Sequence, residues 1–312
     1  MEKIEFNHSP VMLNECIEGL KINPDGIYVD GTMGGAGHSK YIVSKLSKNG
    51  KLIGIDRDIT AINVSKERLA EFSNVIYVQD NHDNIQKILE KLEFDKVDGI
   101  LLDLGVSSYQ LDERNRGFSY IGDAALDMRM DKSQKLDAKF VLNNYKEEEL
   151  ARIIFEYGEE KFSRRIAKNI CLYRKEKEIE TTLELVKIIE KSIPKTYSKD
   201  GHPAKRTFQA IRIEVNNEIK PLYETVLKCI DLLNPGGRLC IITFHSLEDR
   251  AVKNAFIEAG GKCTCPPDFP YCICGNKSKG KIITRKPIIP TEKEQNENSR
   301  SKCAKLRIFE KK

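Results

Sequence analysis

Acidic residues that end apolar runs, beside a cluster of glycines, are the part of this sequence best suited to chemistry. The first run, residues 27–30, ends at Asp30 and leads directly into the string GTMGGAGHS. The second run ends at Asp56, the third ends two residues before His82, and the fourth carries Asp103 near its end. Glycines let the backbone turn tightly and approach a ligand, and a carboxylate after the second strand accepts hydrogen bonds from ribose hydroxyls. The pattern predicts a nucleotide-like ligand with Asp56 on its ribose and His82 near its adenine.

The glycine cluster matches neither of two common phosphate-binding fingerprints. The best alignment to GxGxxG, residues 35–40, puts Lys40 where the third glycine belongs, and no GxxxxGK[ST] string is present. An acid just before the glycines would repel a pyrophosphate but attract the amino group of S-adenosylmethionine. The sequence therefore favours S-adenosylmethionine over NAD as the cofactor. An ordinary strand, turn and helix, with glycines placed for packing, is the alternative.

The stretch DGILLDLGVSSYQ, residues 98–110, carries a second chemical signal. Asp103 ends its apolar run, and Ser107, Ser108 and Gln110 follow closely. The amino group of a nucleobase is a poor nucleophile because its lone pair is delocalised into the ring. A carboxylate that accepts its hydrogen bond restores electron density, and methyl transfer otherwise depends on positioning and dehydrating the acceptor. Asp103, Ser107 and Ser108 are the predicted catalytic residues, and capping of the next turn is the alternative role for Asp103.

Alternating strands and helices are needed to bring these acids together. The predicted strands are continuous apolar runs, typical of strands buried on both faces, at 27–30, 52–56, 75–80 and 98–104. Helical patterns separate them, which predicts βαβ units, a parallel sheet and an α/β fold. Segment 110–200 has no convincing strand and is predicted to be a mostly helical insertion. The expected later elements are a helix at 222–234, a strand at 238–244, a helix at 248–259 and β-rich pieces at 281–289 and 304–309.

Length and composition exclude several classes of protein. The chain has 312 residues, 40% of them hydrophobic and 32% charged, with a net charge of +5. It is too apolar for a disordered chain, and its length suits two domains or one domain with a large insertion. No apolar stretch approaches 18 residues and the N-terminus has no signal-peptide core, so we expect neither a membrane span nor secretion. Nine cysteines without a secretory signal indicate a reducing compartment, and we expect a cytoplasmic protein.

Four cysteines near the C-terminus form a candidate metal site. Cys263, Cys265, Cys272 and Cys274 follow the spacing C-x-C-x6-C-x-C. Four thiolates this close can hold zinc tetrahedrally, although the usual pairs are spaced C-x2-C. Free thiols on a loop are the alternative, and a metal assay on protein purified without chelator distinguishes the two.

Two groups of cations suit contacts with RNA phosphates. One is a helical stripe formed by Lys161, Arg164, Arg165 and Lys168. The other is the string HPAKRTFQ, residues 202–209, followed by Arg212, in which cations alternate with polar groups and an aromatic ring. A solvated charged face is the alternative explanation of the first group.

Several long strings resemble those of the MraW/RsmH family of bacterial ribosomal RNA methyltransferases. They span about residues 8–255 and read HSPVMLNE, DGTMGGAGHS, GIDRD, DGILLDLGVSS, RGFSY, LDMRMD, YGEEKFSRRIA, HPAKRTFQAIRIEVN, PGGRL and FHSLEDR. The resemblance implies a class I methyltransferase with a Rossmann-like, mostly parallel seven-stranded sheet. It also implies S-adenosylmethionine-dependent methylation of a cytidine exocyclic amino group in 16S ribosomal RNA, which we expect to be the partner as part of the small ribosomal subunit.

The resemblance also carries residue roles and domain limits. The implied cofactor-binding residues are Gly35, Ala36, Gly37, His38, Asp56, His82, Asp103 and Gln110. The expected domains are a first methyltransferase part at 1–112, a helical RNA-recognition insertion at 113–204 and a second methyltransferase part at 205–312. His82 stands where the family usually has a larger aromatic, and Ala124-Ala125 stands where Gly-Pro is expected.

Two other kinds of function stay open from the sequence. One is methylation of another acceptor, such as DNA or a protein amide, although DLGVSS differs from the Asn/Asp-Pro-Pro-Tyr string of DNA amino methyltransferases. The other is a non-catalytic RNA-binding assembly factor that keeps a cofactor fold. Cofactor binding without turnover on ribosomal subunits would favour the second.

Overall fold

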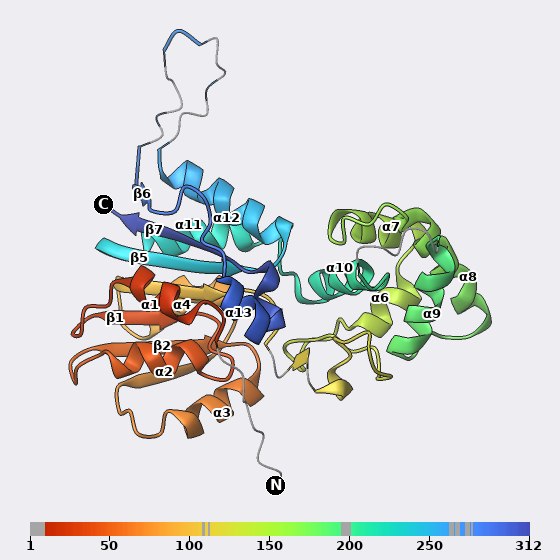
Figure 1. Cartoon of the computed structure of the whole chain (residues 1–312), viewed down its shortest axis with the longest axis horizontal. Helices are drawn as coiled ribbons and strands as arrows, with labels where there is room; N and C mark the ends of the chain where they lie inside the picture. Colours follow the sequence, from red (N-terminus) through yellow and green to blue (C-terminus); the bar gives the residue numbers. More distant parts are fainter. Residues whose placement is uncertain are drawn as a thin grey trace. The chain divides into compact units, whose positions relative to one another are not determined.

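The computed structural model describes two compact units within the chain. The described residues are 10–107, 110–111, 113–194, 201–261, 265, 269–271, 275 and 277–312. One unit, here the sheet unit, comprises residues up to Gly105 together with Ile219–Lys312, and the other, the helical unit, comprises Val106–Glu218. Figure 1 shows both along the chain.

A seven-stranded sheet forms the centre of the sheet unit. Its strands are β1 (Ile27–Asp30), β2 (Lys51–Asp56), β3 (Val75–Gln79), β4 (Val97–Asp103), β5 (Leu233–Thr243), β6 (Gly280–Ile282) and β7 (Lys305–Lys311). Their order is β3-β2-β1-β4-β5-β7-β6. The first five run parallel, whereas β7 is antiparallel to both β5 and β6. The predicted mostly parallel, seven-stranded sheet is therefore confirmed.

The apolar runs form central strands because both faces of the sheet are covered. Alternate residues of each strand enter two separate apolar clusters: Tyr28 and Leu101 belong to one, Val29 and Ile100 to the other. Strand β3 differs from the expectation of full burial, since its residues are only partly buried. It lies at the edge of the sheet and has a strand neighbour on one side only.

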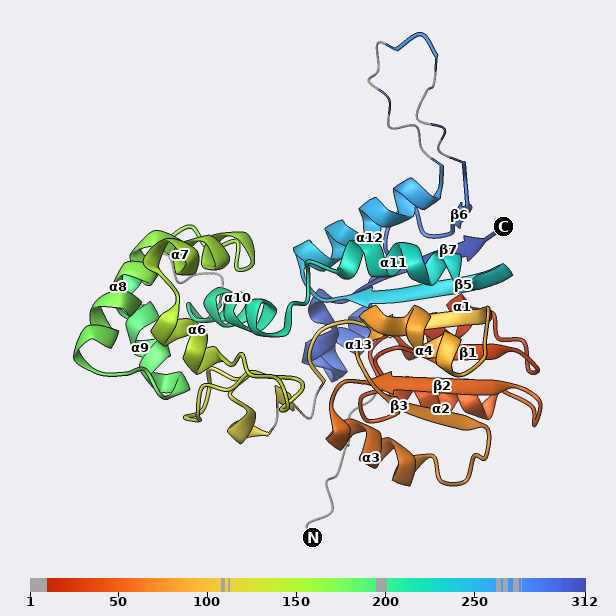
Figure 2. The same cartoon turned by 180° about the vertical axis from the view of Figure 1, so that it is seen from behind.

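Helices cover the two faces of this sheet, as the two views show (Figures 1 and 2). Those in the cluster of Tyr28 are α1 (Leu13–Leu20), α2 (Gly37–Ser44) and α3 (Ile59–Arg68). Those in the cluster of Val29 are α4 (Ile85–Lys91), α11 (Leu222–Asp231) and α12 (Ser246–Ala259). The unit also contains α13 (Glu292–Glu297) and the 3-10 turns His82–Asn84 and Ser299–Cys303.

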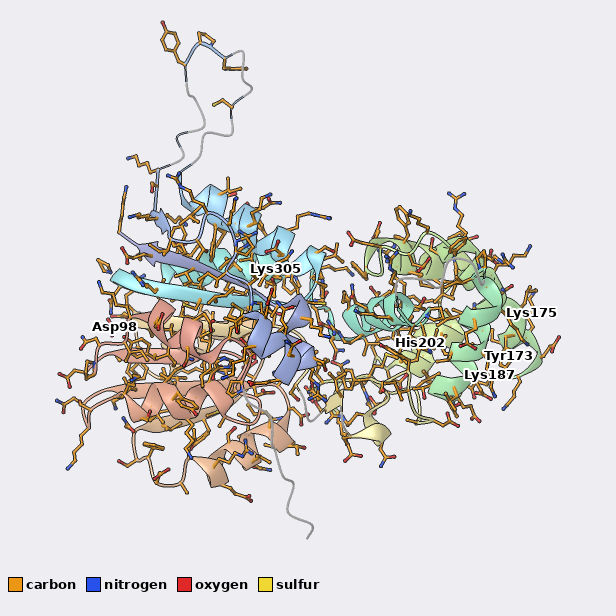
Figure 3. The ribbon with its side chains drawn as sticks, viewed as in Figure 1. Asp98, Tyr173, Lys175, Lys187, His202 and Lys305 are labelled. Atoms are coloured by element: carbon orange, nitrogen blue, oxygen red, sulfur yellow. The ribbon has the colours of Figure 1, made fainter. Side chains whose placement is uncertain are left out.

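Strand β5 starts earlier than the predicted strand at 238. Leu233 pairs with Val97 and Arg238 with Gly99, so the four residues between Leu233 and Arg238 bulge out of the ladder. Gly236 has φ of +81°, a conformation that glycine adopts without strain. Asp98, labelled in Figure 3, holds this end of the sheet: its Oδ2 accepts from the Ile27 amide at 2.8 Å and its Oδ1 from the Asn234 side chain at 2.9 Å.

The helical unit has its own core, around which the helices of its described part pack. They are α6 (Ala138–Asn144), α7 (Glu147–Glu156), α8 (Ser163–Glu176), α9 (Thr182–Ser192) and α10 (Lys205–Asn216), preceded by the 3-10 turn Arg114–Arg116. Apolar side chains at helical spacing, such as Leu150, Ile153 and Ile154, are fully buried. None of the described helices is long and apolar enough to span a membrane.

The limits of this unit differ from the predicted insertion at 113–204. Residues 106–112 and 205–218 also fall within the helical unit. The reason is packing: α10 lies against α6 and α7, so the chain enters the second part of the sheet unit only at Ile219. The sequence analysis predicts neither the helix at Lys205–Asn216 nor the unit in which it packs.

Ala124-Ala125, which stands where the family is expected to have Gly-Pro, forms a turn held by backbone and side-chain hydrogen bonds. The Ala124 amide donates to Thr182 Oγ1 at 3.0 Å, and the Ala124 carbonyl accepts from the Thr182 amide at 2.9 Å. Nearby, the buried Asn216 side chain accepts from the Met130 amide and donates to the Met128 carbonyl, both at 2.8 Å. These bonds fix the backbone of the LDMRMD segment, in which Met128 has φ of +58°.

Truncation of a central strand should test this architecture. Leu101 in β4 is 0% exposed, so Leu101→Ala should lower the free energy of unfolding by about 2–5 kcal/mol, through lost burial and a cavity. Ile289→Ala in the same unit, at a side chain that is 62% exposed, should change it by less than about 0.5 kcal/mol. Urea denaturation followed by circular dichroism measures both, and equal midpoints for the two variants would contradict the fold.

Candidate functional site

The glycine loop between β1 and α2 is shaped by hydrogen bonds to the neighbouring strands. The Gly31 amide donates to the Leu101 carbonyl and the Met33 amide to the Ile55 carbonyl, both at 2.9 Å. Gly34 and Ala36 both have left-handed backbone, with φ of +51° and +61°. For Ala36 this conformation is costly, and it persists only because its surroundings hold it. The loop therefore has a fixed shape.

Two side chains of α3 hold the outer side of this loop. Ser65 donates to the Gly34 carbonyl at 2.9 Å, and Arg68 donates to the Gly35 carbonyl at 2.7 Å. The sequence gives no direct signal for either contact, because both residues lie more than 30 positions away from the loop.

Glycine at position 37 is explained by packing. A Cβ added at Gly37 would lie 2.8 Å from Pro10 Cγ. Packing therefore accounts for this glycine, as the alternative interpretation of the loop anticipated. Packing and ligand binding are compatible explanations of this glycine, because the same close packing sets the path of the loop.

Asp30 organises the loop and is not open to a ligand. Its side chain is 1% exposed, and its two oxygens accept from the Thr32 amide at 3.2 Å and from Ser39 Oγ at 2.6 Å. Burial raises the pKa of Asp30, while the bond from Ser39 opposes that rise. The expectation that this acid would bind the cofactor's amino group directly is therefore replaced by a supporting role.

Asp56 ends β2 and is prepared to accept further hydrogen bonds. One of its oxygens accepts from the Gly34 amide and the other from the Asp58 amide, each at 2.8 Å. A carboxylate has about four lone-pair positions, so each oxygen retains one for a ligand. Burial raises the pKa of Asp56 to about 6 in spite of these bonds.

Asp103 ends β4 and carries a buried oxygen without a partner. The Asp103 amide donates to Thr32 Oγ1 at 2.6 Å, which ties the strand end to the glycine loop. Its Oδ2 lies 3.7 Å from His38 Nδ1, and its Oδ1 is buried with no hydrogen bond from any described residue. Burial, together with the nearby charges of Asp30 and Glu248, raises the pKa of Asp103 to about 6, and His38 opposes this. An unpaired buried acceptor is costly, so this oxygen is a natural ligand position.

His38 lies beside Asp103, and a backbone carbonyl orients its ring. Its Nε2 lies 2.9 Å from the Val11 carbonyl. Because a carbonyl only accepts, Nε2 carries the proton and Nδ1 faces Asp103. The predicted cofactor residue His38 and the predicted catalytic residue Asp103 are thus neighbours.

His82 begins the 3-10 turn after β3 and is neutral near pH 7. Burial lowers its pKa to about 4, with Asp83 opposing and Arg57 adding to the effect. A Cβ added at Gly31 would lie 3.3 Å from His82 Cβ, which places this ring beside the start of the glycine loop. An uncharged imidazole can stack on an adenine without adding a cation to the site.

Glu248 is a component of this region that the sequence-based prediction missed. It is 2% exposed, and its Oε2 accepts from the Phe244 amide at 2.8 Å. It closes a capping box at the start of α12, where His245 accepts from the Glu248 amide at 3.4 Å. A capping residue followed by glutamate three positions later is a recognisable sequence signal.

Three predicted site residues fall in the helical unit or outside the described chain. Gln110 and Ser107 bond to each other: the Ser107 amide donates to Gln110 Oε1 at 3.1 Å and the Gln110 amide to Ser107 Oγ at 3.2 Å. Both belong to the helical unit. Ser108 lies outside the described residues. Their predicted cofactor and catalytic roles stay predictions.

The predicted cysteine site falls mainly outside the described part of the chain. Cys263, Cys272 and Cys274 are not among the described residues, and Cys265 is described only as a partly buried residue. The residues that the structure does describe contain no cluster of three or more metal-ligating side chains. The zinc interpretation stays a prediction.

The cation clusters divide into exposed and internally paired groups. Arg164, Arg165 and Lys168 are exposed on α8, as the stripe predicted. In the second cluster, Phe208 is 3% exposed, so it belongs to the core and cannot stack on a base. Arg212 forms a two-bond ion pair with Glu218, at 3.0 and 2.8 Å.

Comparison with known proteins identifies the family. The model of the MraW methylase family matches residues 5–312. The chain belongs to the MraW methylase family. It is 59% identical to a Ribosomal RNA small subunit methyltransferase H of Lachnospira eligens, over 98% of each chain. It is also 59% identical to a protein of the same name from Clostridium botulinum, over 99% of this chain and 100% of that one.

The match to the MraW methylase family extends over both units of the chain. A crystal structure of an rRNA methylase from Streptococcus thermophilus is similar with a TM-score of 0.43 and 14% identity, covering 96% of this chain and 93% of that one. The family match, in contrast, covers both units and all seven strands of the sheet. The predicted class I methyltransferase fold is therefore confirmed by family membership together with the strand order.

The acids of the sheet unit fit S-adenosylmethionine, the cofactor of this methyltransferase class. When bound, this cofactor supplies a methyl group on a positively charged sulfur. The test of fit is the buried, unpaired Asp103 Oδ1, an acceptor suited to a cation or to a donor of hydrogen bonds. Asp56 retains acceptor positions for ribose hydroxyls, and His82 offers a neutral ring for adenine.

Cofactor affinity should fall in mild acid. Asp56 and Asp103 both have a pKa of about 6, so they are largely ionised at pH 7 and largely protonated at pH 5. For each carboxyl that must be ionised, the affinity should fall roughly tenfold across that interval. Calorimetry with S-adenosylmethionine measures the profile. Asp103→Asn should bind more weakly at pH 7 and show a shallower pH dependence, and a profile identical to that of the wild type would contradict the assignment.

Proposed function

We propose that this chain methylates the exocyclic amino group of a cytidine in small-subunit ribosomal RNA, with S-adenosylmethionine as the methyl donor. The observation that carries the proposal is the end of β4, where Asp103 presents a buried and unpaired carboxylate oxygen beside the glycine loop. Membership of the MraW methylase family, and the names of relatives that are 59% identical, support methyl transfer to ribosomal RNA.

The contribution of the residues is mainly positioning and electrostatics. Ionised Asp103 accepts a hydrogen bond from the acceptor amino group, which opposes delocalisation of the nitrogen lone pair into the ring. Thr32 fixes the backbone of Asp103, and Glu248 adds negative charge nearby. The acceptor is neutral at physiological pH, so its surplus proton can leave to water after transfer, without a dedicated base.

Recognition of the RNA is assigned to the helical unit in this proposal. Exposed Arg164, Arg165 and Lys168 supply positive charge for phosphates. Ser107, Ser108 and Gln110, in the segment after β4, would contact the cofactor or the acceptor base. The target base must leave its stack to be methylated. A ribosomal substrate also implies that the protein acts in the cytoplasm, on ribosomal RNA alone or within the small subunit.

A labelling experiment tests this function directly. The protein is incubated with S-adenosylmethionine carrying a labelled methyl group and with small ribosomal subunits that lack the modification. We expect label in one cytidine, mapped by mass spectrometry of the digested RNA. Asp103→Ala should reduce the rate at least a hundredfold, because it removes the carboxylate at the reacting centre.

A matched variant separates this effect from general damage to the strand. Asp95→Ala removes an exposed acid that precedes the opposite end of β4, and it should leave the rate within twofold of the wild type. Label in a protein, in DNA or in a base other than cytosine would refute the proposed acceptor. Tight cofactor binding without any label in the subunits would favour a non-catalytic assembly factor.

A further inference from the structure

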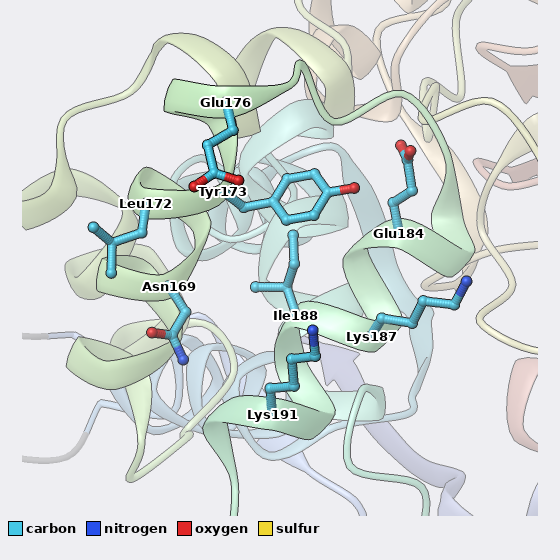
Figure 4. Close-up of a pocket in the computed structure, with 8 residues that line it drawn as sticks. All are labelled: Asn169, Leu172, Tyr173, Glu176, Glu184, Lys187, Ile188 and Lys191. Carbon is cyan, nitrogen blue, oxygen red and sulfur yellow. The ribbon is translucent and has the colours of Figure 1, made fainter.

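The helical unit contains a pocket of about 300 Å³ between α8 and α9. Tyr173 and Leu172 line it from α8, and Lys187, Ile188 and Lys191 line it from α9. Figure 3 labels Tyr173 and Lys187 within this unit, and Figure 4 shows the pocket in detail. Its volume is at the lower end of the range for small-molecule sites.

The lining combines a flat aromatic ring with apolar contacts. In Figure 4 the Tyr173 ring lies across the middle of the pocket, next to Ile188. Tyr173 is partly buried, and Leu172 is 49% exposed although it is apolar. An aromatic face flanked by aliphatic side chains is suited to a planar ring such as a nucleobase.

Two cations stand on the α9 side of the same pocket. Lys187 and Lys191 are four positions apart, so they lie on the same face of the helix. Both are exposed, and neither forms an ion pair with a described residue. Other lysines of this unit are paired, such as Lys139 with Glu178 at 3.1 Å. The positive charge at the pocket is therefore available to an anionic ligand.

The acids of the pocket cancel only part of this charge. Glu184 is held by Lys177 and by the capping box of α9, and the bond from Lys177 lowers its pKa to about 2. Glu176 is exposed and also lines the pocket, so it offsets part of the charge of the two lysines. Arg165 and Lys168 continue the α8 face that carries Leu172 and extend the positive charge away from the pocket.

We propose that this pocket binds an unpaired nucleotide of the RNA substrate, other than the one that is methylated. The base stacks on Tyr173 against Leu172 and Ile188, and its phosphate is held by Lys187 and Lys191. Charge complementarity selects the occupant, because a stacking surface beside unpaired lysines matches single-stranded RNA. The inference rests on the proposed function for the identity of the RNA, and it gives the helical unit a specific contact.

Binding of a labelled single-stranded RNA decamer, together with methylation of small ribosomal subunits, tests this site. Tyr173→Ala should weaken decamer binding roughly 5- to 100-fold, the loss expected for removing one stacking ring. Tyr173→Phe keeps the ring and should bind within twofold of the wild type. The double variant Lys187→Glu/Lys191→Glu should bind at least tenfold more weakly and with a smaller dependence on salt.

The control is a second charge reversal in the same unit. Lys132→Glu/Lys135→Glu makes the same change in net charge at two exposed lysines outside the pocket, and it should alter decamer binding less than threefold. Calorimetry with S-adenosylhomocysteine should give wild-type cofactor affinity for every variant, and thermal unfolding should confirm that each is folded.

The outcomes separate the pocket from the proposed function. Equal losses in the two charge reversals, or wild-type binding by Tyr173→Ala, would overturn the pocket. If the pocket variants bound the decamer normally but bound ribosomal subunits more weakly, the proposal would also be overturned, since the occupant would then be a ribosomal protein. A wild-type protein that binds the decamer through these residues but methylates no ribosomal RNA would refute the proposed function and leave the pocket standing.

Discussion

Three carboxylates held at the ends of adjacent parallel strands, one enclosed and two partly buried, are the constraint on which the rest of the sheet unit depends. Burial raises the pKa of Asp30, Asp56 and Asp103, so ionising them costs free energy that the fold must offset. Backbone amides and the hydroxyls of Thr32 and Ser39 supply part of the compensation. The unpaired oxygen of Asp103 is the part left for a ligand, a common exchange of stability for function.

The strand order explains why these acids meet at one place. The chain builds β1, β2 and β3 outward in one direction, and then returns to place β4 and β5 on the other side of β1. In doubly wound sheets the ligand crevice lies where this reversal occurs, outside the carboxyl ends of the strands. Asp30 and Asp103 end the two strands that flank the reversal, and the glycine loop crosses between them.

In the helical unit, some cations are buried or paired within the protein and others are exposed to solvent. Arg116 is buried and donates to the carbonyls of Arg129 and Met130, and Arg212 is paired with Glu218. These cations hold the unit together and are not presented to RNA. Exposed cations lie on α8 and α9 and also elsewhere in the unit, for example at Lys132 and Lys205. A contact surface for RNA is therefore better identified from partners and exposure than from counts of lysine and arginine.

The sequence by itself determined the α/β alternation, the first four strands to within one residue, the glycine loop and the acids that follow the strands. Local chemistry suffices there, since continuous apolar runs and glycine turns depend on near neighbours. Only the tertiary structure decided that Asp30 is enclosed, that Phe208 is core, that α10 packs with the helical unit and that Tyr173 and Lys191 share a pocket. Each of these depends on contacts between residues distant along the chain, which periodicity and spacing do not encode.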